Sequence, residues 1–281
     1  MINTFKQKIS KFFISLSSKI LSVGGHVPHS IAIIMDGNRR YAQKKNFVKI
    51  KGHEDGLSRL LDVLLWSLEL GIKEVTVFAF SIDNFNRPQE EVKSLMTLAK
   101  EKFIKLSEKG EYFNQYGVQV CFYGNLNFIN DEELKKVLFD VEEKTKTNHK
   151  IKLNVCFPYN STEEIISAVE KSRDQILNEE IISISQDKDF DSRTILESHL
   201  YGGYSVNPEI LIRTSGEIRL SNFLLYQTRF SKLYFVDKFW PEFGFKDFFQ
   251  ILISYNIEYK SHLRKLKELE EKNNFKIITS N

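Results

Sequence analysis

Residues 31–40 of the chain read IAIIMDGNRR, five apolar residues followed at once by an acid, a glycine, an amide and two arginines. The apolar run 31–35 lacks helical periodicity and is typical of a strand that is covered on both faces, as in a parallel sheet. The polar residues 36–40 would then follow the carboxyl end of that strand, where open α/β sheets bind their ligands. This stretch therefore predicts both the fold class and the edge of the sheet that carries the site.

Strand-like and helix-like segments alternate along the rest of the chain. After 31–35, the strand-like segments are 74–80, 118–123, 151–157, 209–212 and 233–236. The helix-like segments are about 53–70, 88–109, 131–146, 161–178, 191–199, a stretch after Arg219, and a long charged segment from about 246 to 272. Such alternation predicts right-handed βαβ units. We expect an α/β fold, a single domain with a central, mainly parallel six-stranded sheet flanked by helices.

The composition limits the class of protein. The 281 residues are 42% hydrophobic and 27% charged, enough for one large α/β domain, and the formal net charge of +3 gives no reason to expect nucleic-acid binding. Cys121 and Cys156 lie in apolar strand-like runs without metal-ligand spacing, so we expect buried thiols in a reducing compartment. No apolar run reaches the roughly 20 residues that span a bilayer, so we do not expect an integral membrane protein.

Residues 1–25 form a segment of their own, ahead of a main domain that we place at 26–281 and that ends in the charged helix. Apolar residues recur in this segment at three- and four-residue steps, lysines occupy much of the remainder, and no acid precedes Asp36. This pattern is typical of a basic amphipathic helix on an anionic membrane surface. The alternative is a helix that packs on its own domain or on a partner.

Polar residues cluster just after three of the predicted strands. They read DGNRR at 36–40, SIDNFNR at 81–87 and RTSGEIRLS at 213–221, and together they bring five arginines to one edge of the sheet: Arg39, Arg40, Arg87, Arg213 and Arg219. Planar guanidinium groups suit bidentate contacts to phosphate oxygens, and glycines allow backbone N–H groups to approach an anion. Each arginine could instead be solvated or paired within the protein.

Asp36 is the carboxylate of the first of these segments and stands next to Arg39 and Arg40. Mg²⁺ grips diphosphate oxygens while taking only one or two protein ligands, so Asp36 is a candidate to hold it. The alternative is that Asp36 caps the helix that follows it. His53, near the start of the next helix, is either part of the same site or only a partly buried histidine. The chain has no Walker A lysine motif, no G-x-G-x-x-G and no nucleophile elbow, which weakens nucleotide-binding and hydrolase interpretations.

Two helix-like segments are strongly apolar, GLSRLLDVLLWSLELG at 56–71 and EVKSLMTLAKEKF at 91–103. Such helices usually pack on a sheet. If they face each other above a phosphate site, they leave an apolar tunnel above the sheet, and a tunnel beside a diphosphate site favours an amphipathic substrate such as an isoprenoid diphosphate.

Several longer motifs occur in a characteristic order: HSIAIIMDGNRRYA, GHEDGL, EVTVFAFSIDNFNRP, ILIRTSGEIRLSNFLLYQ and FWPEF. In order and spacing they resemble the signature regions of the cis-prenyltransferase (undecaprenyl diphosphate synthase) family, over about residues 26–250. The RRY version of the first motif, the SIDNFNRP segment and the RTSGEIRLSNFLL segment are most similar to the catalytic subunits of eukaryotic dehydrodolichyl diphosphate synthases.

The resemblance implies a function and a cofactor. It implies a Mg²⁺-dependent transferase that condenses isopentenyl diphosphate repeatedly, in cis, onto an allylic diphosphate such as farnesyl diphosphate. The product would be a long-chain polyprenyl diphosphate, a precursor of dolichol for protein glycosylation. The place of action would be the cytoplasmic face of the endoplasmic reticulum membrane, with the enzyme bound peripherally.

The resemblance also implies roles for individual residues. Asp36 matches the essential aspartate that helps to hold metal and diphosphate. The residues that match the allylic diphosphate region are Gly37, Asn38, Arg39, Arg40 and His53, and those that match the isopentenyl diphosphate site are Arg213, Arg219 and Ser221. Ser81, Asn84 and Arg87 match a further conserved segment, in which the asparagine is implicated in proton removal. Because a neutral amide is a poor base, we expect Asn84 to orient substrate and leave the proton acceptor open.

Two departures from the family pattern bear on partners. Lys232 stands where bacterial homodimeric members have a metal-binding glutamate, and the C-terminal arginine-x-glycine motif that completes a neighbouring subunit's site is missing. Both predict a chain whose site is completed by a different, accessory subunit. The alternatives are a homodimer that makes shorter products, and a noncatalytic accessory subunit, against which the intact Asp36, Asn38 and Arg40 argue.

Overall fold

The computed structural model describes residues 16–21, 26–108, 111–177, 192–203 and 207–273. Its centre is a six-stranded sheet in which every neighbouring pair of strands is parallel, in the order β3-β4-β2-β1-β5-β6. The strands are β1 (Ser30–Ile34), β2 (Glu74–Phe78), β3 (Val118–Tyr123), β4 (Ile151–Cys156), β5 (Ile210–Thr214) and β6 (Lys232–Val236). The prediction of a parallel α/β sheet is confirmed.

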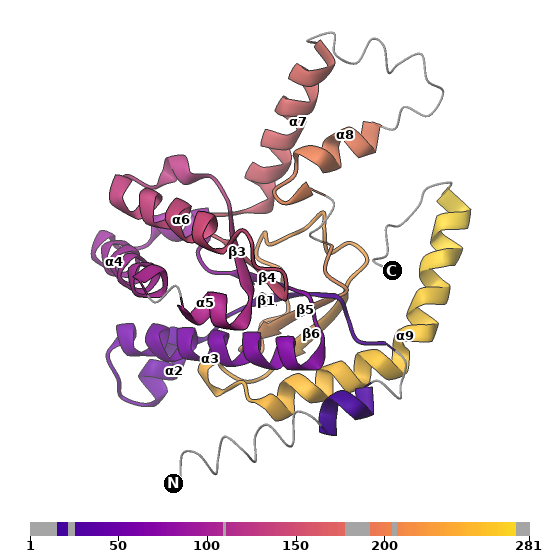
Figure 1. The fold of residues 1–281 in the computed structure, drawn as a ribbon, viewed down its shortest axis with the longest axis horizontal. Coiled ribbons are helices and arrows are strands. Elements are labelled where there is room, and N and C mark those ends of the chain that lie inside the picture. Colours follow the sequence, from indigo (N-terminus) through magenta and orange to yellow (C-terminus); the bar gives the residue numbers. More distant parts are fainter. Residues whose placement is uncertain (1–15, 22–25, 109–110, 178–191, 204–206, 274–281) are drawn as a thin grey trace.

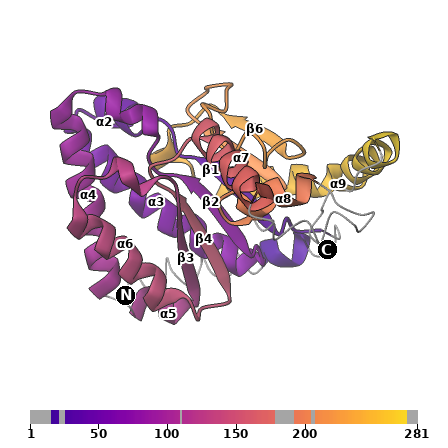
Figure 2. The same cartoon turned by 90° about the horizontal axis from the view of Figure 1, so that it is seen from above.

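Helices connect the strands and cover both faces of the sheet (Figures 1 and 2). The α-helices are α2 (Asn38–Lys44), α3 (Lys49–Leu70), α4 (Gln89–Glu108), α5 (Glu111–Tyr116), α6 (Glu132–Thr145), α7 (Ser161–Leu177), α8 (Ser192–His199) and α9 (Phe245–Asn273). The short 3₁₀ helices are η1 (Ile82–Asn86), η2 (Leu126–Phe128) and η4 (Trp240–Glu242). Helix α3 begins four residues earlier than the sequence predicted, and the short α5 was not predicted.

One predicted helix is wrong. The stretch after Arg219 forms a series of turns over 221–230 instead of a helix. Ser221, Asn222 and Leu224 have positive φ angles there, and a chain in the left-handed region cannot continue a right-handed helix.

The strands are buried because both faces of the sheet are covered. Along β1, Ile31 and Ile33 belong to the larger core cluster, together with residues of α3, α6 and α9. Ala32 and Ile34 point to the other face and join a smaller cluster under the 221–230 turns. Successive side chains of a strand alternate between faces, so a strand with two apolar neighbours reads as one continuous apolar run.

The parallel register aligns the carboxyl ends of the central strands. Ile34 of β1 pairs with Phe78 of β2 on one side and with Arg213 of β5 on the other. The residues that follow each of these strands therefore meet at one edge of the sheet. Of the two cysteines, Cys156 is buried and Cys121 is only half-buried, and both are free thiols.

Residues 16–21 form a short helix beside α9 (Figure 1). Leu21 is fully buried in the large core cluster, and its carbonyl accepts a hydrogen bond from Asn256 Nδ2 of α9 at 3.1 Å. Leu16 and Ile20 of the same turns are about half exposed. The end of the predicted amphipathic helix therefore packs on its own domain through one face, while residues 1–15 lie outside the described part. Among the described helices, none combines the length and the apolar character that a membrane crossing requires.

Candidate active site

A cavity of about 1360 Å³ opens at the carboxyl edge of the strands. Its lining includes all twelve residues that the sequence marked as site candidates: Asp36, Gly37, Asn38, Arg39, Arg40, His53, Ser81, Asn84, Arg87, Arg213, Arg219 and Ser221. They come from the ends of three strands and from the first turns of the elements that follow. Their individual roles stay predictions, but the structure places them around one space.

Asp36 pairs with Arg213, the most buried of the five arginines that line the cavity. Arg213 Nη2 donates to Asp36 Oδ2 at 2.8 Å, and Nη1 donates to Ser221 Oγ at 2.8 Å and to the Arg219 carbonyl at 2.5 Å. The Arg213 residue is only 3% exposed, so its charge is balanced mainly by Asp36. The pair links the end of β1 to the end of β5.

Asp36 does not cap α2, so that alternative is wrong. The helix is preceded by Gly37, without a side-chain capping bond. Asp36 Oδ1 instead accepts from the N–H of Gly37 at 2.6 Å, and the Asp36 carbonyl accepts from Thr214 Oγ1 at 2.8 Å. Gly37 has φ +98°, and a Cβ there would lie 2.8 Å from Phe239 Cδ1, so this position requires glycine. The Gly37 N–H and the Arg213 guanidinium thus hold the carboxylate, and Thr214 holds the backbone behind it.

The donor set around Asp36 fits a hard cation that takes few protein ligands. The Asp36 side chain is 30% exposed toward the cavity, and Oδ1 lies 3.6 Å from Arg40 Nη2. In the part of the chain that the structure describes, no group of three or more His, Cys, Asp or Glu side chains could enclose a metal ion. A metal at Asp36 would therefore take most of its ligands from substrate oxygens and water, which is the usual habit of Mg²⁺.

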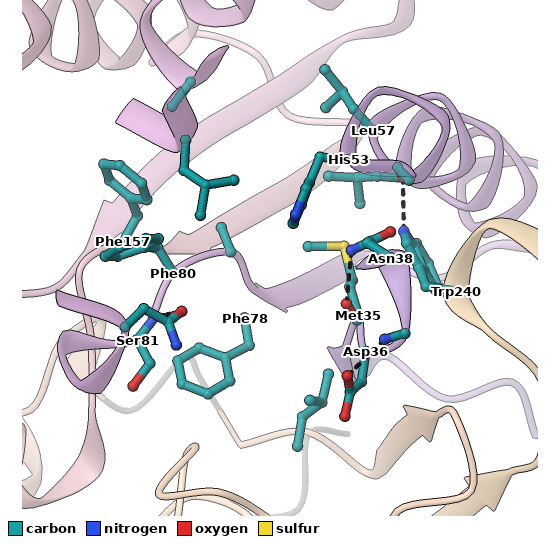
Figure 3. A pocket seen from close by; sticks show the side chains of 18 of the residues that line it. Met35, Asp36, Asn38, His53, Leu57, Phe78, Phe80, Ser81, Phe157 and Trp240 are labelled. Atoms are coloured by element: carbon teal, nitrogen blue, oxygen red, sulfur yellow. Dashed lines mark hydrogen bonds between the residues drawn. The ribbon is translucent and has the colours of Figure 1, made fainter. Parts of the chain in front are cut away.

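Asn38 occupies a tight gap between α2 and α3. Its Nδ2 donates to the Met35 carbonyl at 3.2 Å. A Cβ at Gly56 would lie only 2.3 Å from Asn38 Oδ1, so the GHEDG segment needs glycine at this point of close approach. Trp240 Nε1 donates to the Gly56 carbonyl at 2.7 Å and closes that side of the cavity, as Figure 3 shows.

Sequence reasoning missed Glu91, which gathers three cations at one side of the cavity. Its carboxylate lies 3.1 Å from Arg39, 3.2 Å from Arg87 and 3.6 Å from Lys49. Burial opposes ionisation of Glu91, but Arg39, Arg87 and Lys49 outweigh it and hold its pKa below the usual range. The signal available in the sequence was the spacing of four residues from Arg87 to Glu91, typical of a helical ion pair.

Sequence reasoning also missed Glu217, which pairs with Arg40 and Arg219. Its Oε1 accepts from Arg40 Nη1 at 2.9 Å, and its Oε2 accepts from Arg219 Nη1. Hydrogen bonds from Arg219 and then Arg40 lower the pKa of Glu217. Arg40 and Glu217 are 177 residues apart, so no local pattern predicted this contact.

His53 lies in the first turns of α3 and faces the same cluster of cations. Burial, followed by the positive charges of Arg87 and Arg39, lowers the pKa of His53 to about 4. The imidazole is therefore neutral at physiological pH. It can donate a hydrogen bond to a ligand or accept one from it, but it does not add to the positive charge of the site.

Ser81 and Asn84 form a reciprocal cap at the start of η1. Ser81 Oγ accepts from the Asp83 N–H at 3.1 Å, and Asn84 Oδ1 accepts from the Ser81 N–H at 3.1 Å. Because the Asn84 oxygen is used in this way, its Nδ2 group is the part that can serve a ligand. The geometry agrees with an orienting role for Asn84 and gives no support to a role as base.

Most of the remaining lining of the cavity is apolar. Its walls come from α3, from α4 and from the sheet, with residues Leu57, Leu60, Leu95, Leu98, Phe103, Phe78, Phe80, Val120, Leu153, Val155 and Phe157. In Figure 3, Asp36, Asn38 and Trp240 lie on one side and the rings of Phe80 and Phe157 on the other. The two apolar helices thus stand beside the charged edge, which is one of the two arrangements that the sequence left open. The tunnel itself stays a prediction.

Lys232 lies away from this site. It begins β6 and pairs with Ile210 at the start of β5, which is the amino edge of the sheet and the opposite edge from Asp36. Its ammonium forms an ion pair with Glu258 of α9. In its own chain, Lys232 therefore neither repels a metal at Asp36 nor replaces a ligand there.

Comparisons with known proteins agree with this arrangement. The family model described as putative undecaprenyl diphosphate synthase matches residues 34–262. A dehydrodolichyl diphosphate synthase complex subunit of Homo sapiens is 41% identical over 248 residues, which cover 87% of this chain and 72% of that protein. An isoprenyl transferase of Thermotoga maritima is 39% identical over 231 residues, with coverage of 82% and 94%.

A solved structure shows the same architecture. Lavandulyl diphosphate synthase from Lavandula x intermedia, in complex with dimethylallyl diphosphate, superposes with a TM-score of 0.73 at 29% identity. The match covers 82% of this chain and 95% of that one.

Proposed function

The chain belongs to the undecaprenyl diphosphate synthase family of cis-prenyltransferases, and from that premise we propose that it condenses isopentenyl diphosphate repeatedly onto an allylic diphosphate such as farnesyl diphosphate. The observation that carries the proposal is a single cavity with five arginines at one end and a long apolar wall at the other. Such a cavity matches a substrate that has a diphosphate head and a hydrocarbon tail.

The arginines divide into two groups that suit two diphosphates. Arg39 and Arg40, beside the neutral His53, would bind the allylic diphosphate at the start of α2, and Arg87 would assist. Arg213, Arg219 and Ser221, after β5, would bind isopentenyl diphosphate. In each cycle the allylic C–O bond breaks and the diphosphate leaves with the electron pair. A new C–C bond forms and one proton is lost, while fixed guanidinium groups stabilise the charge on the leaving diphosphate.

We propose Mg²⁺ as the cofactor, held by Asp36. A bound Mg²⁺ would neutralise diphosphate charge. Asp36 is suited to this task because Arg213 and the Gly37 N–H fix its carboxylate at the mouth of the cavity. The Nδ2 group of Asn84 would orient substrate near the segment 81–87.

The chain is further proposed to make a long-chain polyprenyl diphosphate for dolichol synthesis, as one subunit of a complex. Relatives from Homo sapiens and from Schizosaccharomyces pombe are named as subunits of dehydrodolichyl diphosphate synthase complexes. A homodimer that makes shorter products is the second candidate, since the isoprenyl transferase of Thermotoga maritima, matched over 94% of its length, is not named as a subunit of a complex.

The surface of α7 supports an accessory subunit as partner. Its exposed apolar residues are Ile166, Val169, Ile176 and Leu177, with exposed fractions of 54%, 52%, 46% and 69%. Exposed large apolar side chains on one helix are a feature of interaction sites. We propose that the accessory subunit covers this face.

We also propose peripheral contact with the cytoplasmic face of the endoplasmic reticulum membrane, through the N-terminal segment. The support is the basic amphipathic pattern of residues 1–20 and the exposed Leu16 and Ile20 beside α9. Flotation of full-length and 2–22-deleted chains with anionic liposomes tests it. Equal flotation of both chains would contradict it.

The main test is incorporation of radiolabelled isopentenyl diphosphate by the purified chain, with farnesyl diphosphate and Mg²⁺, in the presence and absence of co-purified partner. We expect long-chain product that depends on Mg²⁺ and increases with the partner. No incorporation under either condition would contradict the proposed function, and full activity of the pure chain would contradict the need for an accessory subunit.

A further inference from the structure

The loop that carries Arg219 and Ser221 contains an unusual turn. Ser221, Asn222 and Leu224 have φ angles of 49°, 59° and 46°, in the left-handed region that residues with a side chain seldom adopt. A turn of this kind persists only where its surroundings impose it. The contacts that impose it come from the first turn of α7.

Ser161, the first residue of α7, bonds to two points of this turn. Its backbone N–H donates to the Asn222 carbonyl at 2.8 Å, and its Oγ accepts from the Leu225 N–H at 2.7 Å. Ser161 is completely buried, which limits the access of water to both bonds. The segment from Asn222 to Leu225 is therefore held at both ends by one residue.

Asn222 in turn completes the cap of α7. Its Oδ1 accepts from the Thr162 N–H at 3.1 Å, and its Nδ2 donates to Thr162 Oγ1 at 3.0 Å. The first N–H groups of a helix lack partners within the helix, and Asn222 satisfies those of Ser161 and Thr162 from another part of the chain. Helix and turn thus stabilise each other.

The turn determines what surrounds Arg213. Ser221 Oγ and the Arg219 carbonyl, at the start of the turn, accept hydrogen bonds from Arg213 Nη1 at 2.8 and 2.5 Å. If the turn relaxed out of the left-handed region, both acceptors would move away from this buried guanidinium. Its orientation toward Asp36 and the cavity depends on them.

From these contacts we infer that Ser161 is a positioning residue for the isopentenyl diphosphate site, because it holds the turn 221–225 that orients Arg213. The inference rests on the proposed function, since it takes Arg213, Arg219 and Ser221 to bind that substrate. Ser161 lies outside the cavity lining that the described residues form, so it acts through its contacts with the turn and with Tyr159 OH, which is 3.1 Å from Ser161 Oγ. Arg39 and Arg40 of α2, which we propose to bind the allylic diphosphate, take no part in the contacts between Ser161 and the turn.

Substitution of Ser161 by alanine tests the inference. Ser161→Ala leaves the Leu225 N–H without its acceptor, and we expect the KM for isopentenyl diphosphate to rise about tenfold while kcat and the KM for the allylic substrate stay within about twofold. The matched control is Ser172→Ala on the same helix, since Ser172 Oγ donates only within α7, to the Ala168 carbonyl at 2.7 Å. The control should leave both KM values unchanged.

A second variant keeps the test decisive if Ser161→Ala does not fold. Asn222→Gly allows the left-handed backbone but loses both side-chain bonds to Thr162, and it should raise the same KM. Combined with Ser161→Ala, it should raise that KM by less than the product of the two single effects, because both act on one turn. An equal rise of the two KM values, or no rise in either variant, would overturn the inference.

Calorimetric titration with isopentenyl diphosphate separates this inference from the proposed function. A full chain that binds the substrate but never elongates it would count against the proposed function alone. In that case, binding about tenfold weaker in Ser161→Ala than in Ser172→Ala would still support the positioning role. Equal affinity in the two variants, or no binding by the wild-type chain, would overturn it.

Discussion

The two edges of the central sheet treat charge in opposite ways. At the amino edge, Glu209 is contacted by His26 Nε2 and Tyr255 OH, each at 2.6 Å, and by the His29 N–H at 2.5 Å. Burial opposes its ionisation, but the hydrogen bonds from His26, Tyr255 and His29 keep the pKa of Glu209 low. Every oxygen of this carboxylate has a partner within the protein, so the arrangement serves the fold.

At the carboxyl edge the charges do not balance. The cavity lining holds seven basic side chains, Arg39, Arg40, Lys49, Arg87, Lys102, Arg213 and Arg219, and only two acidic ones, Asp36 and Asp83. Even with Glu91 and Glu217 behind them, positive charge remains in excess. The carboxylate of the amino edge is paired within the fold, whereas the excess of positive charge at the carboxyl edge suits an anionic ligand.

The largest expected effect comes from the carboxyl edge. Asp36→Asn keeps the shape of the side chain but removes the charge that faces Arg213 and would hold the metal. We expect turnover to fall by at least about a thousandfold, roughly 4 kcal/mol of transition-state stabilisation, in steady-state assays at saturating Mg²⁺. The control is Asp62→Asn on α3, whose partner Arg59 lies outside the cavity lining of the described chain. Turnover near that of the wild type would show that Asp36 does not hold the metal in catalysis.

The matching change at the amino edge should affect stability alone. Glu209→Ala leaves Tyr255, His26 and the His29 N–H without their shared acceptor, so we expect the free energy of unfolding to fall by about 3 kcal/mol in urea titrations. The kcat of the folded variant should not change. A loss of kcat that exceeds the unfolded fraction would break the distinction between the two edges.

His53 should make the carboxyl edge sensitive to acid. Its pKa falls from 6.5 to about 4 on folding, so below 6.5 the unfolded chain binds more protons than the folded one. The contribution of neutral His53 to stability is therefore complete above pH 6.5 and is lost as the pH falls toward 4. We expect wild type to lose about 2 kcal/mol between about pH 6.5 and about pH 5 relative to His53→Gln. Parallel pH profiles for the two proteins would show that His53 is not held neutral.

A smaller effect is expected from Arg219, because its side chain is 60% exposed. Arg219→Ala should raise the KM for isopentenyl diphosphate about tenfold and the KM for the allylic substrate much less, since one charge-assisted contact is lost. The matched control is Arg229→Ala on the same stretch of turns, where the arginine pairs with Glu197. An equal rise of both KM values would show that the two diphosphate sites are assigned wrongly.

The sequence was sufficient for the sheet and for the gathering of the twelve candidates. The apolar runs marked the strands, and parallel strands necessarily bring the residues that follow them to one edge. The sequence did not predict contacts between residues that lie far apart along the chain. Glu217 meets Arg40 across 177 residues, and Glu209 meets His26 across 183.

The turns after Arg219 show the other limit. The sequence predicted a helix in the stretch after Arg219. Hydrogen bonds from Ser161 and Thr162 to Asn222 instead hold it in a left-handed turn. Long-range contacts overrode local propensity there, at a point beside the site.

Lys232 gives the smallest expected effect and tests whether the amino edge is free of catalytic duty. Its side chain is 27% exposed and that of its partner Glu258 is 48% exposed, so the ion pair is open to solvent. Lys232→Ala should change the free energy of unfolding by no more than about 1 kcal/mol. Turnover should not change, because the start of β6 lies at the opposite edge from Asp36. Thermal unfolding and turnover of Lys232→Ala, compared with Lys152→Ala at the start of β4, give the measurement. A selective loss of turnover in the Lys232 variant would mean that this edge reaches a site in a neighbouring subunit, and the division of the sheet into a structural and a functional edge would then hold only within one chain.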